Sequence, residues 1–161
     1  MLRTMKDVGP PISNSDLDDV EAELGLRMPP AFRAFLLRNN GGVPEPSYYF
    51  ITGLRNNPWN NVDSFDPLHS DGVGGGVLES TLDMRDRLPA DCVVIASAPG
   101  GALVIGAVGP REGRVWFWDW YVSMLDDPET RIYPVADSFE AFLAGLADEA
   151  DMPPIGGVNG G

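Results

Sequence analysis

The sequence has few of the side chains on which metal and redox chemistry depends. Among its 161 residues there is one cysteine, Cys92, one histidine, His69, and one lysine, Lys6. A single thiol excludes an intrachain disulfide and a Cys-x-x-Cys motif. A single imidazole excludes His-rich metal sites and most zinc sites, which need two or more imidazole or thiolate ligands. Because three β-branched residues follow Cys92, we expect it to be a small buried apolar side chain.

Positive charge is also scarce. The chain carries 11 Lys and Arg against 24 Asp and Glu, which gives a net charge of -13. Proteins that hold a phosphate backbone need a basic face, so we expect no direct binding of nucleic acid and no contact with anionic membranes. The length fits one domain, and the 43% hydrophobic content is enough for a core.

No uninterrupted apolar run is long enough to cross a membrane. Residues 92–110 lack charge, but Pro99, Gly100 and Gly101 interrupt them and predict a β-hairpin through the core. Residues 1–11 lack the apolar stretch of a signal peptide. We therefore expect a cytoplasmic protein, and the lone cysteine fits a reducing compartment.

Hydrophobic periodicity predicts four helices. The first is capped by Ser13 or Ser15 and ends at Gly25, with its remaining face filled by acidic residues. The second follows Pro30 and ends in a left-handed exit at residues 39–42, the third spans residues 78–88, and the fourth is capped by Asp137 or Ser138. Predicted strands cover residues 48–51, 92–97, 102–108, 115–121 and 131–135, and residues 56–69 are predicted to be loop.

The strand at residues 115–121 is unusually aromatic. Its period of two places Trp116, Trp118 and Trp120 on one face and heavy side chains on the other. Because both faces are bulky, we expect a central strand covered by helices on at least one side.

The excess of acid is concentrated in a few segments. Residues 56–84 contain five carboxylates and no Lys or Arg, and Trp59 is isolated in a polar stretch, where it suits a protein interface. A second acidic group lies at residues 126–129. The candidate partner-binding residues are Trp59, Asp63, Asp66, Asp71, Asp126, Asp127 and Glu129.

Catalytic and metal-binding patterns are weak. The glycines at 72–76 lack the lysine of a phosphate-binding loop, and no Gly-x-Ser-x-Gly motif supports a triad through His69. Asp66, His69 and Asp71 could hold a hard cation such as Ca²⁺ or Mn²⁺, but the EF-hand spacing is missing. We expect no catalytic residue, cofactor or metal. A hydrolase using two carboxylates of residues 63–71 stays open as an alternative.

Four segments in order resemble the SMI1/KNR4 proteins of the SUKH superfamily. Residues 12–46 carry the acidic helix with E-x-x-LG and the helix ending in NGG, and residues 88–108 carry the leucine-proline and hairpin segment. GRVWFWDW and DSFEAFLAGL resemble the family's aromatic strand and closing helix. Two positions depart from the pattern: Met28 replaces the usual leucine, and the turn at residues 97–101 lacks the family's polar D-x-x-G-N sequence.

The resemblance implies an α+β single domain, with a mixed, mostly antiparallel β-sheet and about four helices packed on it. The predicted domain covers residues 12–150 and follows an N-terminal extension at 1–11, and the prolines and glycines of residues 151–161 predict a flexible tail. The resemblance implies no catalytic residue. Bacterial members resemble immunity proteins that neutralise a partner toxin, often a nuclease, whereas fungal members suggest a regulatory or scaffold module as the alternative.

Overall fold

Five antiparallel strands form the main sheet, in the order β5-β6-β7-β8-β9. The computed structural model describes residues 1–54, 58–70, 75–120 and 130–152. The strands of this sheet are β5 (Ser64–Phe65), β6 (Cys92–Ala98), β7 (Gly101–Gly106), β8 (Val115–Asp119) and β9 (Ile132–Ala136). Two small antiparallel sheets accompany it, β1 (Thr4–Lys6) with β2 (Val43–Glu45) and β3 (Tyr48–Phe50) with β4 (Trp59–Asn61).

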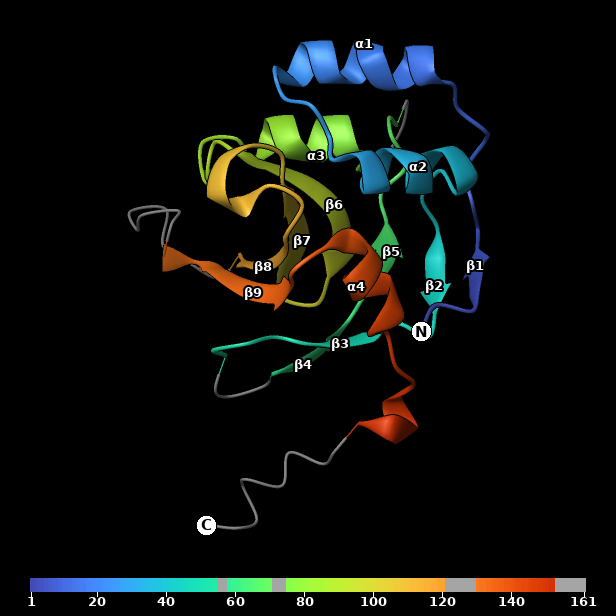
Figure 1. Cartoon of the computed structure of the whole chain (residues 1–161), viewed down its shortest axis with the longest axis vertical. Coiled ribbons are helices and arrows are strands. Elements are labelled where there is room, and N and C mark those ends of the chain that lie inside the picture. Colours follow the sequence, from blue (N-terminus) through green and yellow to red (C-terminus); the bar gives the residue numbers. More distant parts are fainter. Residues whose placement is uncertain (55–57, 71–74, 121–129, 153–161) are drawn as a thin grey trace.

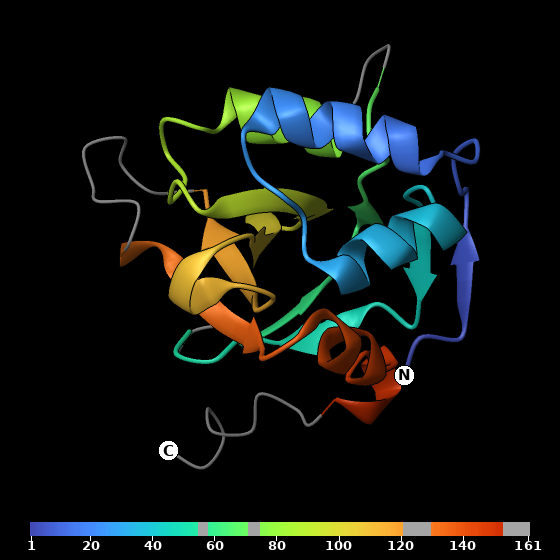
Figure 2. The same ribbon diagram turned by 45° about the horizontal axis from the view of Figure 1, so that its top comes forward.

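Four α-helices lie within the described residues: α1 (Asn14–Leu24), α2 (Pro30–Arg38), α3 (Val77–Asp83) and α4 (Phe139–Ala144). Two short 3₁₀ turns, η1 (Gly109–Arg111) and η3 (Glu149–Asp151), complete the elements. Figures 1 and 2 show α1 lying across α3 at one end of the molecule and α4 toward the other. The fold is α+β, as predicted from the sequence.

The ends of α1 follow the predicted capping signals. The Ser13 hydroxyl accepts a hydrogen bond from the Asp16 N–H at 3.1 Å, and the Asp16 carboxylate accepts one from the Ser13 N–H at 2.8 Å. This reciprocal pair is a capping box. Gly25 ends the helix at φ 71°, in the left-handed conformation that glycine adopts without steric cost.

Other helix ends differ from the predictions. Asn39 after α2 is extended, and the left-handed conformation comes only at Gly41 and Gly42. The third helix stops at Asp83 rather than Leu88. Ser138 caps α4 and is followed at the third position by an alanine, so the capping box expected from Asp137 does not form.

The main sheet is covered on both faces, and β8 lies inside it between β7 and β9, as predicted. Val115 and Phe117 face the main core, where rings from α2, α4 and β5 pack edge to face. Trp118 lies in a second cluster with Cys92, which is buried as expected. The hairpin β6–β7 turns at Pro99–Gly100, with Gly100 at φ 80°.

One expectation about chain organisation was wrong. Residues 56–69 are not simply loop, because β4 and β5 lie within them. Residues 1–11, predicted as an N-terminal extension, contact the rest of the chain: β1 pairs with β2, and the Leu2 N–H donates to the Leu143 carbonyl at 2.9 Å. Of the predicted tail, residues 153–161 lie outside the described residues.

Candidate functional site: an acidic groove along α1

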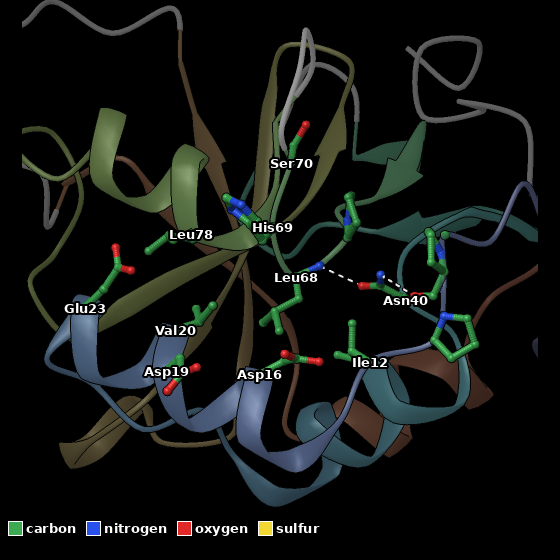
Figure 3. A pocket seen from close by; sticks show the side chains of 14 residues that line it. Ile12, Asp16, Asp19, Val20, Glu23, Asn40, Leu68, His69, Ser70 and Leu78 are labelled. Carbon is green, nitrogen blue, oxygen red and sulfur yellow. Dashed lines mark hydrogen bonds between the residues drawn. The ribbon is translucent and has the colours of Figure 1, made fainter.

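A groove of about 610 Å³ runs between α1 and residues 67–70, which follow β5. We call it the α1 groove, and Figure 3 shows its lining side chains. It is lined by Gly9, Pro10, Pro11, Ile12, Asp16, Asp19, Val20, Glu23, Asn40, Pro67, Leu68, His69, Ser70 and Leu78. This set contains no Lys or Arg. A ligand in the groove therefore meets carboxylates and apolar side chains, with His69 as the one titratable nitrogen.

The groove joins an apolar interior to an acidic edge. Val20, Leu68 and Leu78 are buried and supply apolar surface. The exposed residues Asp16, Asp19 and Glu23 follow one another along α1, as Figure 3 shows. Spacings of three and four residues place side chains on one face of a helix, so the sequence itself aligns these carboxylates with the groove.

The other acidic side of α1 pairs with Arg33 from α2, which partly neutralises it. The Arg33 guanidinium pairs with Asp18 at 3.1 Å and with Glu21, and it also donates to the side chain of Asn14 at 3.2 Å. The Glu21 side chain is only 10% exposed. The sequence assigned Glu21 to an exposed acidic face, and this was wrong, because its carboxylate connects the two helices.

Among the described residues, no such cation pairs with the acids at the edge of the groove. Within the described part of the chain, neither Asp19 nor Glu23 has an ion pair. The N–H and hydroxyl of Ser13 lower the pKa of Asp16, so that carboxylate is ionised at neutral pH. The negative charge of α1 is therefore divided into a side toward α2 that Arg33 partly neutralises and a side along the groove that has no ion pair among the described residues.

The opposite wall of the groove is held by Glu79 from α3. Its carboxylate contacts the His69 Nδ1 at 2.5 Å and accepts a hydrogen bond from the Ser70 N–H at 2.8 Å. This arrangement fixes the segment that faces α1. His69 is thereby directed to a carboxylate of its own wall rather than to the acids of α1.

Asn40 closes one end of the groove. Its side-chain oxygen accepts a hydrogen bond from the Leu68 N–H at 2.8 Å, and its side-chain nitrogen donates to the Pro10 carbonyl at 2.8 Å. The next residue, Gly41, has φ 77°, and a Cβ there would stand 2.6 Å from the Pro67 nitrogen. The NGG motif therefore has a structural role: the Asn40 amide connects Pro10 to Leu68, and Gly41 leaves room for the close approach of the Pro67 backbone.

A second cavity, of about 510 Å³, shares Pro67 with the lining of the α1 groove. We call it the Asp66 cavity. It is lined by Ser64, Asp66, Pro67, Gly75, Ser80, Asp83, Met84, Val94, Ala96, Ser97, Gly101, Ala102 and Trp120. Asp66 is only 7% exposed and is hydrogen-bonded to Ser80. Burial, opposed by that hydrogen bond and reinforced by nearby Glu79, raises the pKa of Asp66 to about 7.

The described site residues predicted from the sequence do not form one surface. Asp63 is exposed, whereas Asp66 is buried and cannot contribute to an open acidic face. Trp59 is partly covered and packs against Phe50 with ring centroids 5.0 Å apart; Trp120, at 51% exposed, is a more open tryptophan. The other candidates, Asp71, Asp126, Asp127 and Glu129, lie outside the described residues.

Sequence reasoning missed the groove acids as a set. It had noted that α1 is acidic, but Asp16, Asp19 and Glu23 were not among the candidate residues. Their spacing was visible. What the spacing could not reveal is that Arg33 neutralises a different side of the same helix.

The described residues also bear on the alternatives. They contain no group of three or more His, Cys, Asp and Glu side chains placed to hold a metal, although Asp71 lies outside them. For a two-carboxylate hydrolase, Asp63 lines neither the α1 groove nor the Asp66 cavity. None of the described helices is both long enough and apolar enough to span a bilayer.

Comparison with known proteins agrees with the order of these elements. A family model, SMI1 / KNR4 family (SUKH-1), matches residues 11–145, which include α1, the NGG motif, the β6–β7 hairpin, β8 and α4. The chain is also similar to the SPbeta prophage-derived uncharacterized protein YokK of Bacillus subtilis (strain 168). The two are 26% identical over 150 residues, which cover 85% of this chain and 76% of that protein. Because the family model matches most of its length, the chain belongs to the SMI1/KNR4 family (SUKH-1).

Proposed function

We propose that this protein is an immunity protein that neutralises a cognate toxin by direct binding, with the α1 groove as the contact surface. The observation that carries the proposal is the uncompensated acidic edge of α1 beside an apolar interior. Family membership supports it, and so does the prophage origin of the relative. The partner is a protein, bound without catalysis, and the encounter takes place in the cytoplasm.

The charge of the groove indicates the chemistry of the partner. A nuclease toxin carries a basic groove to hold phosphates, and an acidic inhibitor can occupy that groove in place of the nucleic acid. Complementary charge also speeds the encounter, to about 10⁸–10⁹ M⁻¹s⁻¹ at low salt. The partner that fits the α1 groove best is a basic surface with apolar side chains, such as that of a nuclease.

The test is co-expression with the toxin encoded beside the gene, followed by a viability assay and a pull-down. We expect the protein to rescue growth and to copurify with the toxin. The Asp19→Asn/Glu23→Gln variant should lose most of this affinity, whereas Glu112→Gln/Glu140→Gln, with the same net charge, should keep it. Both control residues are exposed and line no part of the α1 groove: Glu112 directly follows η1, and Glu140 lies in α4.

Two outcomes would overturn the proposal. Rescue of growth without a complex would contradict direct binding of the toxin. Equal loss of affinity in the two double variants would contradict the α1 groove as the contact surface. If no toxin gene lies nearby and the chain instead captures several regulatory proteins, the scaffold module is the correct function.

A further inference from the structure

We propose that the Asp66 cavity is a binding site for the guanidinium group of an arginine side chain presented by a partner protein. This site is separate from the α1 groove, and the inference does not depend on whether the partner is a toxin. It rests on the lining of the cavity and on how the protein pairs its own arginines with tryptophans on the same sheet face.

The lining offers what a guanidinium needs. Asp66 and Asp83 supply carboxylates, and the hydroxyls of Ser64, Ser80 and Ser97 can accept further hydrogen bonds. Trp120 supplies an aromatic surface that is half exposed. Arginine presents five N–H donors and a flat face that stacks on indole, so it can use both kinds of surface at once. No Lys or Arg lies in the lining to occupy the carboxylates.

The space is created by small residues. Gly101, Ala102 and Ala96 lie in the half of the β6–β7 ladder next to its turn, and none of them has a side chain large enough to fill the gap beside Trp120. Gly101 is fixed by its neighbour strand, because a Cβ there would stand 1.9 Å from the Trp118 carbonyl oxygen. The hollow is therefore a consequence of the tight β7–β8 ladder.

The neighbouring tryptophans show the same arrangement already complete. Arg111 lies over the Trp116 ring at 6.0 Å and is paired with Asp91, with its Nε 3.0 Å from a carboxylate oxygen. Arg114 also lies over Trp116 at 6.0 Å and pairs with Asp137 at 2.7 Å. At this strand, then, the protein repeatedly combines an arginine, an indole ring and an aspartate.

Trp120 is the next tryptophan along the chain and directly follows β8. Its ring lies 6.1 Å from Trp118, whose own ring is covered by Arg87 at 5.9 Å. Among the described residues, no cation lies over Trp120, although two aspartates line the same cavity. The Asp66 cavity therefore has the aspartate and the indole of this arrangement and lacks the arginine.

The buried state of Asp66 gives a cation a further role. With its pKa raised to about 7, the carboxyl of Asp66 is partly protonated at neutral pH. A guanidinium bound beside it would favour the ionised form. An arginine side chain thus offsets the cost of burying the Asp66 carboxylate in its charged form, and a neutral ligand does not.

The test titrates the full chain with N-acetyl-L-arginine amide and follows the Trp120 indole resonance by NMR. N-acetyl-L-citrulline amide, which has nearly the same shape and no charge, is the matched ligand. We expect a saturable shift with the arginine probe and an affinity at least about tenfold weaker with citrulline, the loss typical of one charged hydrogen bond. Equal shifts with both probes, or no saturable shift with either, would overturn the inference.

Three variants locate the site. Asp66→Asn and Trp120→Leu should each weaken binding of the arginine probe by about tenfold or more, whereas Asp63→Asn, which is exposed and outside the cavity, should leave it unchanged. Trp120 is half exposed, so its substitution tests the site even if Asp66→Asn fails to fold. Because Trp120→Leu has no indole at this position, its binding is followed through a backbone resonance of Ala102. Unchanged binding in Trp120→Leu would also contradict the site.

The α1 groove variant separates this result from the proposed function. Asp19→Asn/Glu23→Gln alters no residue of the Asp66 cavity, so it should bind the arginine probe as the parent does. If the parent's probe affinity depended on these two residues, the arginine would be held in the α1 groove and the present inference would be wrong.

Discussion

The carboxylate of Glu21 accepts a hydrogen bond from the Met28 N–H at 2.6 Å and pairs at the same time with Arg33. One side chain of α1 thereby holds both the turn that follows the helix and the helix after it. Glu21 is the glutamate of the E-x-x-LG motif, and these contacts give it a structural role that requires no function in binding.

Replacing Glu21 by alanine should destabilise the fold. The Met28 N–H would lose its acceptor and Arg33 would lose one of two carboxylates, which together predicts a loss of about 2–3 kcal/mol in the free energy of unfolding. Glu23→Ala, two residues away on the exposed side, should change it by less than about 0.5 kcal/mol. Urea denaturation of both variants measures the difference, and similar losses would contradict the role given to Glu21.

Two glycines in left-handed conformation should respond differently to alanine. Gly25 has φ 71° and nothing within 4 Å of an added Cβ, so Gly25→Ala should cost only backbone strain, about 1 kcal/mol. Gly41 has φ 77° and would place its Cβ 2.6 Å from the Pro67 nitrogen, so Gly41→Ala should cost at least about 2 kcal/mol more. Thermal unfolding of the pair checks this. Equal losses would mean that the Gly41 contact relaxes freely.

The raised pKa of Asp66 makes stability depend on pH. Because the folded state holds this proton up to pH about 7 and the unfolded state releases it near 4, the folded state binds more protons between these values. This contribution to stability is therefore present at pH 4 and is lost as the pH rises toward 7. Asp66→Asn should reduce the decline by a few kcal/mol at most. Unfolding from pH 4 to 8 measures it, and an identical pH profile in the variant would contradict the assignment.

Toxin binding should weaken as salt is added. The acids of the α1 groove steer a basic partner through charge, and a Debye length of about 10 Å at 0.1 M salt screens that attraction. The association rate should therefore fall with ionic strength, and it should fall less steeply for Asp19→Asn/Glu23→Gln than for the parent protein. Surface plasmon resonance at several salt concentrations gives both slopes. A rate insensitive to salt would remove charge steering from the proposed function.

The sequence predicted those elements whose signal is local. Ser13 and Gly25 mark α1 because capping depends on neighbouring residues, and the β6–β7 hairpin follows from β-branched runs around Pro99 and Gly100. β5 was missed because its two residues form a strand through pairing with β6, some 30 positions away, and through a bridge between Phe65 and Gly42. A pattern within residues 56–69 carries no trace of that partner.

The candidate site was less predictable because it depends on relations between elements. The burial of Asp66 results from α3 and β6 closing around it, and nothing in the acidic stretch distinguishes it from the exposed Asp63. Likewise the groove edge became visible only when Arg33 was seen to pair with one side of α1. Charge can be counted in a sequence, whereas its compensation requires the folded chain.

Two consecutive residues of α3, Glu79 and Ser80, contact residues 66–70, which contribute to the linings of both cavities. Glu79 fixes His69 and Ser70 at the α1 groove, Ser80 is hydrogen-bonded to Asp66 in the second cavity, and Pro67 lines both. A ligand that moved these residues from one cavity would also alter the space in the other. By thermodynamic reciprocity, any factor by which the first ligand changed the affinity of the second would be returned in equal measure. Two contacts with a partner, one in each cavity, would then be coupled through the residues that the cavities share.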